Sequence, residues 1–135
     1  MKHLIALAFF VVAAPAALDS GRVQLADNAR TAAHGTYQLR VYTINRGKLD
    51  DFIKGWREHV YPLRLQQGYK IPFAYAIRST NQFVWLVSYD GPETWEAKEA
   101  AYYSSSARTS VKPDPAELIA RPDQLFAEPV IAPDR

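Results

Sequence analysis

Histidine and cysteine, the side chains that most often carry catalysis and bind metals, are scarce in this 135-residue chain. Two of its three histidines, His3 and His34, precede the first predicted strand, so His59 is the one histidine of the folded part. The sequence contains no cysteine. A multi-histidine metal site, a thiolate nucleophile and a disulfide framework are therefore excluded. We expect neither a metal nor a cofactor.

His59 lies at the border of an apolar helical stripe. It follows Phe52 by seven residues, which places the two side chains about 20° apart around a helix, and it lies about 60° from Trp56. Two interpretations stay open. In the first, His59 opens into a cavity as a haem ligand or general base. In the second, it is a boundary side chain that needs only one hydrogen bond.

Arginine and aromatic residues form a second candidate group. Arg40 and Tyr42 alternate along a predicted strand and so project from the same face. A strand-borne arginine between aromatic rings can bind an anionic, apolar ligand between sheet and helices. The alternative is an arginine paired to a carboxylate, with core or dimer-interface aromatics around it. The candidate ligand-binding residues are Arg40, Tyr42, Trp56, His59, Trp85 and Tyr89.

The N-terminal segment 1–17 is predicted to be a secretory signal peptide. Lys2 precedes an apolar run, Leu4 to Ala17, that is shorter than the roughly 20 residues of a membrane-spanning helix. Ala14-Pro15-Ala16 has the small-x-small pattern of a cleavage site. An uncleaved N-terminal anchor is the alternative. We expect a secreted or periplasmic protein that has no membrane contact after cleavage.

The rest of the chain divides into a flexible leader (18–36), one domain (37–131) and a short tail (132–135). With 48% hydrophobic residues, the chain has enough apolar side chains for a packed core. Sixteen Lys and Arg residues against 14 Asp and Glu residues leave little net charge, and no basic cluster is present. Nucleic acid is therefore not an expected partner.

Hydrophobic periodicity predicts the order strand, helix, strand, strand, helix, strand. The strands are expected at 37–44, 70–78, 82–89 and 124–131. A first helix follows Leu49, with a kink or an end at Pro62 and a stop at Gly68. A second helix is expected at 93–103, with serines 104–106 at its end, and a short capped helix from Asp114.

This order predicts an α+β, ferredoxin-like βαββαβ fold, in which a four-stranded antiparallel sheet carries two main helices on one face. Proline positions agree with that topology. Pro72 and Pro129 fall in the predicted second and fourth strands, which lie at the sheet edges, and proline is tolerated only at edges.

Several stretches resemble the NIPSNAP family. They are Tyr37-Gln38-Leu39-Arg40-Val41-Tyr42-Thr43, Gly47-Lys48-Leu49-Asp50-Asp51-Phe52 with Trp56 and Pro62-Leu63, and Asn81-Gln82 leading into Val84-Trp85-Leu86-Val87-Ser88-Tyr89. The resemblance implies a dimeric α+β barrel, in which two such sheets join. Where the family tends to have a histidine in the third strand this chain has Trp85, and where it tends to have a tryptophan there is Val87.

The resemblance does not specify an activity, because related barrels include cofactor-independent monooxygenases, haem-handling enzymes and ligand-binding modules. The leading hypothesis is an exported homodimeric module, non-enzymatic or weakly catalytic, that binds a small apolar or anionic ligand or a protein partner. The alternative is a cofactor-independent monooxygenase or haem-handling enzyme. A purely structural dimer is the third.

Overall fold

The computed structural model describes residues 35–131. The predicted signal peptide (1–17), the leader as far as residue 34 and the tail (132–135) lie outside the described residues. The elements are β1 (Thr36–Ile44), α2 (Leu49–Gly55), the π-helical η1 (Trp56–Val60), α3 (Tyr61–Gln66), β2 (Lys70–Ile77), the 3-10 helix η2 (Arg78–Thr80), β3 (Gln82–Tyr89), α4 (Trp95–Ser104), α5 (Ser106–Thr109), the 3-10 helix η3 (Pro115–Leu118) and β4 (Ile119–Ala127).

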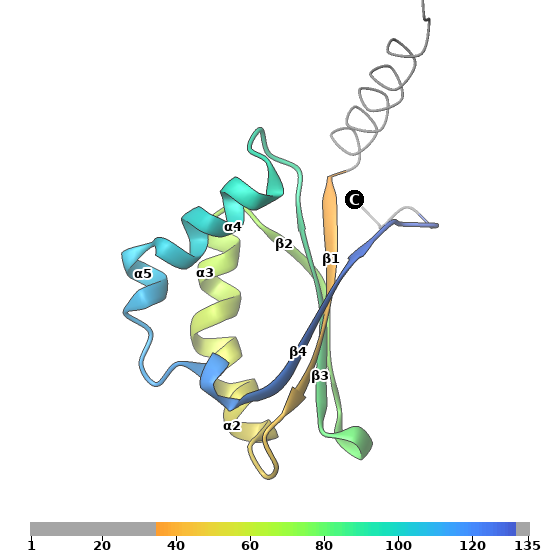
Figure 1. Cartoon of the computed structure of the whole chain (residues 1–135), viewed down its shortest axis with the longest axis vertical. Coiled ribbons are helices and arrows are strands. Elements are labelled where there is room, and N and C mark those ends of the chain that lie inside the picture. Colours follow the sequence, from red (N-terminus) through yellow and green to blue (C-terminus); the bar gives the residue numbers. More distant parts are fainter. Residues whose placement is uncertain (1–34, 132–135) are drawn as a thin grey trace, which may run out of the picture.

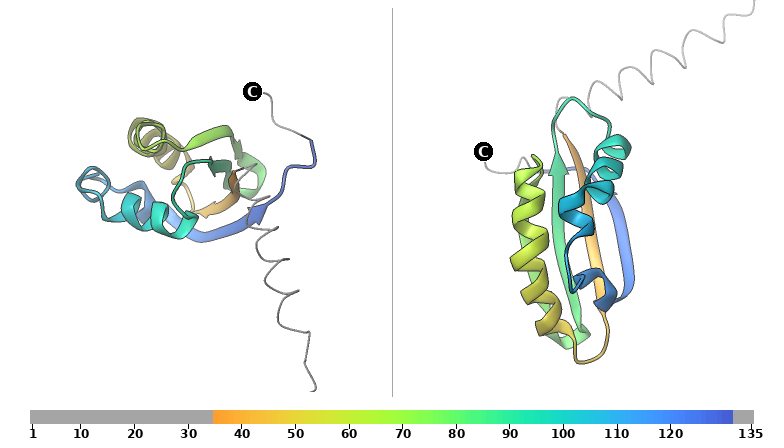
Figure 2. Two further views of the ribbon diagram at one scale, coloured as in Figure 1. Left: turned by 90° about the horizontal axis from the view of Figure 1, so that it is seen from above. Right: turned by 90° about the vertical axis from the view of Figure 1, so that its left-hand side faces the viewer.

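The four strands form one sheet in the order β2-β3-β1-β4, with every neighbouring pair antiparallel. The α-helices lie on one face of this sheet (Figures 1 and 2). The predicted α+β, ferredoxin-like topology is therefore confirmed. None of the helices within residues 35–131 is long and apolar enough to cross a membrane.

The first helical unit runs without interruption from Leu49 to Gln66 through α2, η1 and α3. The sequence predicted a kink or an end at Pro62, but the irregularity lies in the turn before it. The N–H of Tyr61 donates to the carbonyl of Trp56, the wider spacing of a π-helix. Proline has no N–H and collides with the carbonyl four residues earlier in a regular α-helix, so a wider turn accommodates it. Gly68 then ends the unit with φ +86°, as predicted.

The second helical unit begins with capped residues. Thr94 accepts a hydrogen bond from the N–H of Ala97 and so caps α4, which starts at Trp95 rather than at the predicted residue 93. Ser105 ends α4 and caps the short α5, within the serine run that the sequence marked as a helix end. Asp114 caps η3 as predicted.

The last strand differs from its predicted position. β4 spans Ile119–Ala127, not 124–131, and the proline within it is Pro122 rather than Pro129. The polar run Arg121-Pro122-Asp123 resembles a turn in sequence, yet an edge strand with exposed side chains tolerates both charge and proline. The edge argument itself holds, because β2 with Pro72 and β4 with Pro122 are the outer strands.

The α-helices cover one face of the sheet and leave the other face open. Inward-pointing residues of β1 and β3 pack against the helices, whereas the opposite face carries apolar side chains and no α-helix (Figure 2). Registers place Leu39 opposite Leu86, Val41 opposite Val84, and Leu39 also beside Leu125 on β4. Tyr75 is 65% exposed there, and Leu125 is 56% exposed.

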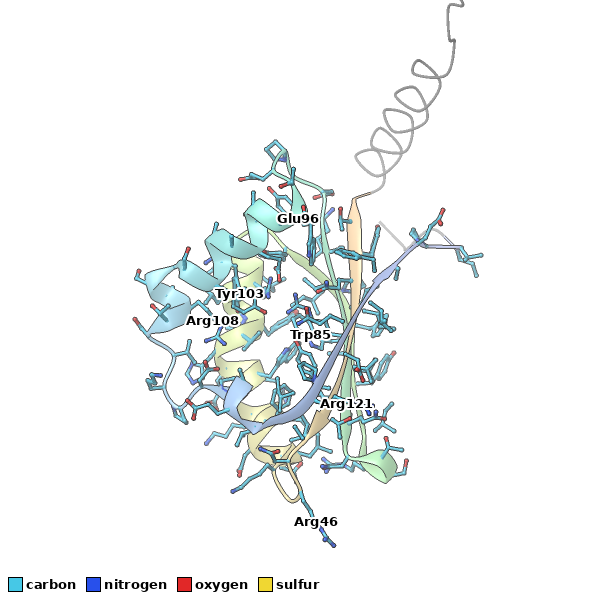
Figure 3. All side chains as sticks on the ribbon, viewed as in Figure 1. Arg46, Trp85, Glu96, Tyr103, Arg108 and Arg121 are labelled. Carbon is cyan, nitrogen blue, oxygen red and sulfur yellow. The ribbon has the colours of Figure 1, made fainter. Side chains whose placement is uncertain are left out.

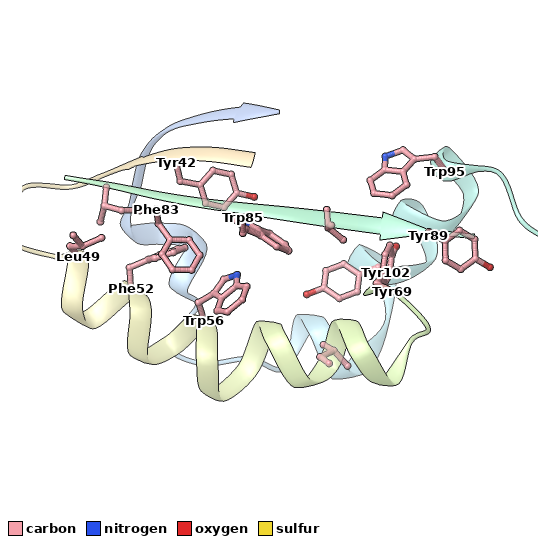
Figure 4. Packing of buried hydrophobic residues seen from close by; sticks show 13 residues of the cluster. Tyr42, Leu49, Phe52, Trp56, Tyr69, Phe83, Trp85, Tyr89, Trp95 and Tyr102 are labelled. Atoms are coloured by element: carbon pink, nitrogen blue, oxygen red, sulfur yellow. The ribbon is translucent and has the colours of Figure 1, made fainter. Parts of the chain in front are cut away.

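The core between sheet and helices contains two aromatic groups. Phe52, Phe83, Trp56 and Trp85 pack at the α2 end, with ring centroids 4.9–5.4 Å apart in successive pairs. A second group, centred on Tyr69, packs at the α4 end (Figure 4). The charged side chains described next lie between these two groups, in contact with rings of both. Tyr69 is packed against Tyr89, Trp95 and Tyr102.

Candidate functional site

Arg40 lies at the centre of β1, and its side chain is only 1% exposed. Its Nε donates to Oε1 of Gln38 at 2.9 Å. Nη1 donates to the hydroxyl oxygens of Tyr42 at 3.4 Å and Tyr103 at 3.2 Å. Nη2 donates to Oε2 of Glu99 at 2.6 Å. An arginine on the inner face of a central strand is thus held by groups from both the sheet and α4.

A second guanidinium meets the same carboxylate. Arg64, on α3, is also 1% exposed. Its Nη1 donates to Oε1 of Glu99, and its Nη2 donates to Oε2 of Glu99 at 3.4 Å and to the hydroxyl of Tyr103 at 3.3 Å. We call Arg40, Arg64, Glu99 and Tyr103 the arginine cluster. It joins β1, α3 and α4 across the interior.

The arginine cluster carries an excess positive charge, because two guanidiniums share one carboxylate. Burial alone would raise the pKa of Glu99, but hydrogen bonds and charge from Arg64 and Arg40 outweigh it and hold that pKa below its ordinary 4.5. Burial also raises the pKa of Tyr42, so its hydroxyl stays neutral at physiological pH. A guanidinium stays charged throughout this range.

Aromatic rings flank both guanidiniums. The Cζ of Arg40 lies 5.0 Å from the centroid of a Trp85 ring. The Cζ of Arg64 lies 3.6 Å from the ring of Tyr102 and 4.5 Å from that of Tyr69. Cation–π contacts of this kind strengthen when water is excluded. Figure 3 shows Trp85 between the sheet and the helical layer, where these rings gather.

Several buried polar atoms in this interior have no hydrogen-bond partner within the described residues. Three of them, Nε1 of Trp56, Nε1 of Trp85 and Nε of Arg64, can only donate. The hydroxyls of Tyr69 and Tyr102 are the other two. Unpaired buried donors are costly and rare in native proteins. Only a hydrogen-bond acceptor, such as a ligand oxygen or a water, can satisfy the three N–H groups.

The structure brings together four of the six predicted site residues. Tyr42 and Trp56 pack against Trp85 with ring centroids 6.1 Å and 5.4 Å away, and Arg40 lies over the same indole. Tyr89 is buried in the Tyr69 group, where it donates a hydrogen bond to Glu93.

His59 lies apart from the arginine cluster. It is half-buried on η1, and it makes none of the hydrogen bonds that hold Arg40 or Arg64. Within residues 35–131 no group of three or more His, Cys, Asp or Glu side chains could hold a metal ion.

Three members of the arginine cluster were not among the predicted site residues: Arg64, Glu99 and Tyr103. The first two leave a signal in the sequence. Arg64 follows Trp56 by eight residues and Glu99 follows Trp95 by four, so both charges lie on the buried stripe of an amphipathic helix. A charge on such a stripe indicates a buried ion pair or a binding site.

Comparison with known proteins places the chain in a family. Residues 37–132 match the NIPSNAP family profile. The chain belongs to the NIPSNAP family. No curated protein matches the sequence. The membership adds no activity, because two NIPSNAP proteins of similar structure are themselves described as uncharacterised or of unknown function.

Solved structures show the same fold. An uncharacterised NIPSNAP domain protein from Burkholderia xenovorans is 19% identical, with a TM-score of 0.62 over 73% of this chain and 99% of its own. A NIPSNAP family protein from Agrobacterium tumefaciens is 16% identical, with a TM-score of 0.65 over 76% of this chain and 100% of its own. A putative antibiotic biosynthesis monooxygenase from Bacteroides thetaiotaomicron is 18% identical, with a TM-score of 0.59 over 77% and 97%.

Trp85 lies at the position in the third strand where the resemblance to the NIPSNAP family led us to expect a histidine. The position points into the interior, since Trp85 is 1% exposed and pairs with Arg40 across the β1–β3 ladder. Tryptophan offers an apolar face and one N–H donor, whereas histidine offers proton transfer near neutral pH. The side chain at this position therefore has an indole N–H donor and no group that transfers a proton near neutral pH.

Proposed function

We propose that this protein is an exported dimeric module that binds a small organic anion between its sheet and its helices. The observation that carries the proposal is the excess positive charge of the arginine cluster: two guanidiniums, each 1% exposed, share one carboxylate. Buried charges are retained where they are paired or where they act on a ligand.

Stability alone is a weak reason for such a cluster. Replacing a buried ion network by apolar side chains of similar volume is often neutral or stabilising, because desolvating the charges costs as much as their attraction returns. The unpartnered donors of Trp56 and Trp85 add to this cost. A bound anion supplies negative charge to the two guanidiniums and acceptors for those donors.

The aromatic surroundings favour a ligand with an apolar body. Trp85 lies over Arg40, and Tyr102 lies over Arg64. Ligand sites in proteins typically combine apolar and aromatic walls with a few well-placed polar groups. Arginine in such a wall holds a planar anion through two parallel N–H donors.

Dimerisation is proposed through the uncovered face of the sheet. In the two central strands its outward positions, which include Leu39, Val41, Val84 and Leu86, carry no charged side chain. A second copy presents the same two central strands, so twofold pairing through them buries apolar area. Faces of this kind are rarely left open on a soluble monomer.

Export is proposed from the N-terminal sequence alone. The short apolar run ending in Ala14-Pro15-Ala16 is typical of a cleaved signal peptide. A mature N-terminus near Ala17, determined by N-terminal sequencing of the secreted or periplasmic protein, is the expected result.

Ligand binding can be tested with 2-naphthoate as the probe and tryptophan fluorescence as the readout, since Trp56 and Trp85 both lie at the site. We expect the mature protein to bind 2-naphthoate, and Arg40→Lys to weaken binding roughly ten- to a hundredfold because lysine lacks the bidentate fork. Arg78→Lys, which changes an arginine 68% exposed, is the matched control and should bind as the wild type does.

Two results would overturn the binding proposal. One is equal affinity of Arg40→Lys and wild type for 2-naphthoate. The other is a stoichiometric haem complex in an absorbance titration, lost in His59→Ala, because that outcome is the signature of the haem-handling alternative. His59→Ala should leave 2-naphthoate binding unchanged.

Dimerisation can be tested by light scattering at micromolar concentration. Wild type should have the dimer mass, and Val84→Arg, which puts a charge on the uncovered face, should be monomeric. Leu65→Arg adds the same charge to an exposed position on α3 and should stay dimeric. A monomeric wild type contradicts this part of the proposal.

A further inference from the structure

Glu99 is the carboxylate that the two buried arginines share. We propose that its carboxylate occupies the position of the ligand's carboxylate, and that α4 is a cover which the ligand displaces. The ligand class that follows is an aromatic monocarboxylate. This inference rests on the proposed function and adds to it the chemical class of the ligand and the control of access.

The cations and their acceptors come from different parts of the fold. Arg40 lies on β1 and Arg64 on α3, while Glu99 and Tyr103 both lie on α4, four residues apart and therefore on one side of that helix. The acceptors that bridge the two arginines are thus supplied by a single helix. Moving α4 outward uncovers both guanidiniums in one step.

A ligand carboxylate cannot reach both arginines while Glu99 stays in place. Both terminal nitrogens of each guanidinium already donate to an oxygen, and Glu99 accepts from both arginines. The carboxylate of Glu99 is 15% exposed and Tyr103 is 45% exposed, so these two acceptors form the solvent side of the arginine cluster. An anion that arrives from solvent meets them first.

Outside the arginine cluster, the contacts of α4 are mainly aromatic: Trp95 and Tyr102 pack on Tyr69, and Nζ of Lys98 lies over the ring of Tyr89. Of its ten residues, only Trp95 and Tyr102 are buried. The ring of Tyr102 lies against the guanidinium of Arg64, so this apolar anchor also depends on the arginine cluster. The segment before α4 contains Gly91 and Pro92, and Ser105 breaks the helix at its other end, which leaves α4 between two non-helical connections.

The geometry of Glu99 specifies the ligand's head group. Its two oxygens receive hydrogen bonds from two arginines, an arrangement that a ligand carboxylate reproduces with the same shape and charge. One carboxylate exchanged for another keeps the local charge constant. When α4 moves outward, the rings of Tyr102 and Tyr103 leave the guanidinium of Arg64, and a planar aromatic body can take their place.

The experiment compares two carboxylates of the same helix. Glu99→Gln removes the internal competitor, and Glu96→Gln, one turn earlier and exposed, is the matched control. We expect 2-naphthoate to bind Glu99→Gln at least tenfold more tightly than wild type, and Glu96→Gln with wild-type affinity. The neutral analogue 2-naphthylmethanol should show no such difference. If Glu99→Gln does not fold alone, refolding should succeed with 2-naphthoate and fail with 2-naphthylmethanol.

Hydrogen exchange on the wild type tests the cover directly. Saturating 2-naphthoate should accelerate exchange of the α4 amides and leave those of α2 and α3 unchanged. If wild type binds the probe and Arg40→Lys weakens it, while Glu99→Gln binds no more tightly or α4 stays protected, the proposed function stands and this inference is overturned. If neither wild type nor Glu99→Gln binds the probe, both are overturned.

Discussion

The two helical units on the sheet are held in different ways. The unit from α2 to α3 buries Leu49, Phe52, Trp56 and Leu63 against the sheet, and its one buried charge is Arg64. In α4 the buried residues are Trp95 and Tyr102, and Glu99 adds the contacts to both arginines. The first unit is fixed mainly by apolar packing, whereas α4 combines two buried aromatic residues with polar contacts through Glu99.

This difference determines which unit a solute can move. Apolar packing scales with buried area, so a small anion leaves it unchanged. A charge-assisted contact, in contrast, can be exchanged for an equivalent contact to the ligand, because the free energy of the outgoing pair is replaced by that of the incoming pair. Because α4 is the helix held by exchangeable contacts, it is the one that can open.

Trp56→Ala gives the largest expected effect, and it tests the apolar unit. Trp56 is 5% exposed and packs on Phe83 and Trp85. Removing its ring leaves a cavity that should lower the free energy of unfolding by about 3–5 kcal/mol. Urea denaturation measures the loss. Tyr61→Ala removes a ring 39% exposed on the same unit and should cost less. A similar loss for both variants contradicts the assignment of Trp56 to the anchor.

Glu99→Gln tests the polar unit and should have a smaller effect that depends on pH. Leaving two arginines without their carboxylate should cost about 3 kcal/mol at neutral pH, the lower end for a broken buried pair because Glu99 keeps some exposure. The folded-state pKa of Glu99 lies below the 4.5 of the free group. Its contribution is therefore complete above pH 4.5 and lost as pH falls through the lowered pKa.

Comparing the two proteins isolates Glu99 from other acids. The pKa values of Asp114 and Asp90 are also below their ordinary values, so both proteins should lose stability in acid. Thermal melts from pH 7 to pH 3 should show wild type falling more steeply and approaching Glu99→Gln. Parallel curves would mean that Glu99 is not the titrating group of the arginine cluster.

Much of the fold follows from the sequence, and particular residues show why. β-branched and aromatic alternation located β1 and β3, whose inner and outer faces have distinct environments. β4 was misplaced because Arg121 and Asp123 lie on an exposed edge, where little selects for apolar alternation. Pro122 then resembled a turn residue. Helix boundaries near Gly68 and Ser105 followed from capping chemistry.

The candidate site was only half predictable for a related reason. Arg40 stood out because it shares one face of a predicted strand with Tyr42, and an arginine among aromatic rings is typical of an anion site. Arg64 and Glu99 lie in helices, where arginine and glutamate are common on exposed faces, and periodicity alone does not pair residues 35 positions apart. The contact between α3 and α4 that makes them partners is a tertiary feature. The fold of a single chain does not test dimerisation, export or ligand binding, so these three stay predictions.

Asp50→Asn gives the smallest expected effect and completes the comparison between buried and exposed charge. Asp50 accepts a hydrogen bond from Arg78 at 2.9 Å, a distance similar to that between Arg40 and Glu99. The side chains of Asp50 and Arg78, however, are 79% and 68% exposed. Water and salt screen such a pair, so its loss should change the free energy of unfolding by less than about 1 kcal/mol. Urea denaturation of Asp50→Asn beside Glu99→Gln measures both under one condition. Equal losses would show that burial does not distinguish the two ion pairs, and the case for α4 as the exchangeable cover would then lose its energetic basis.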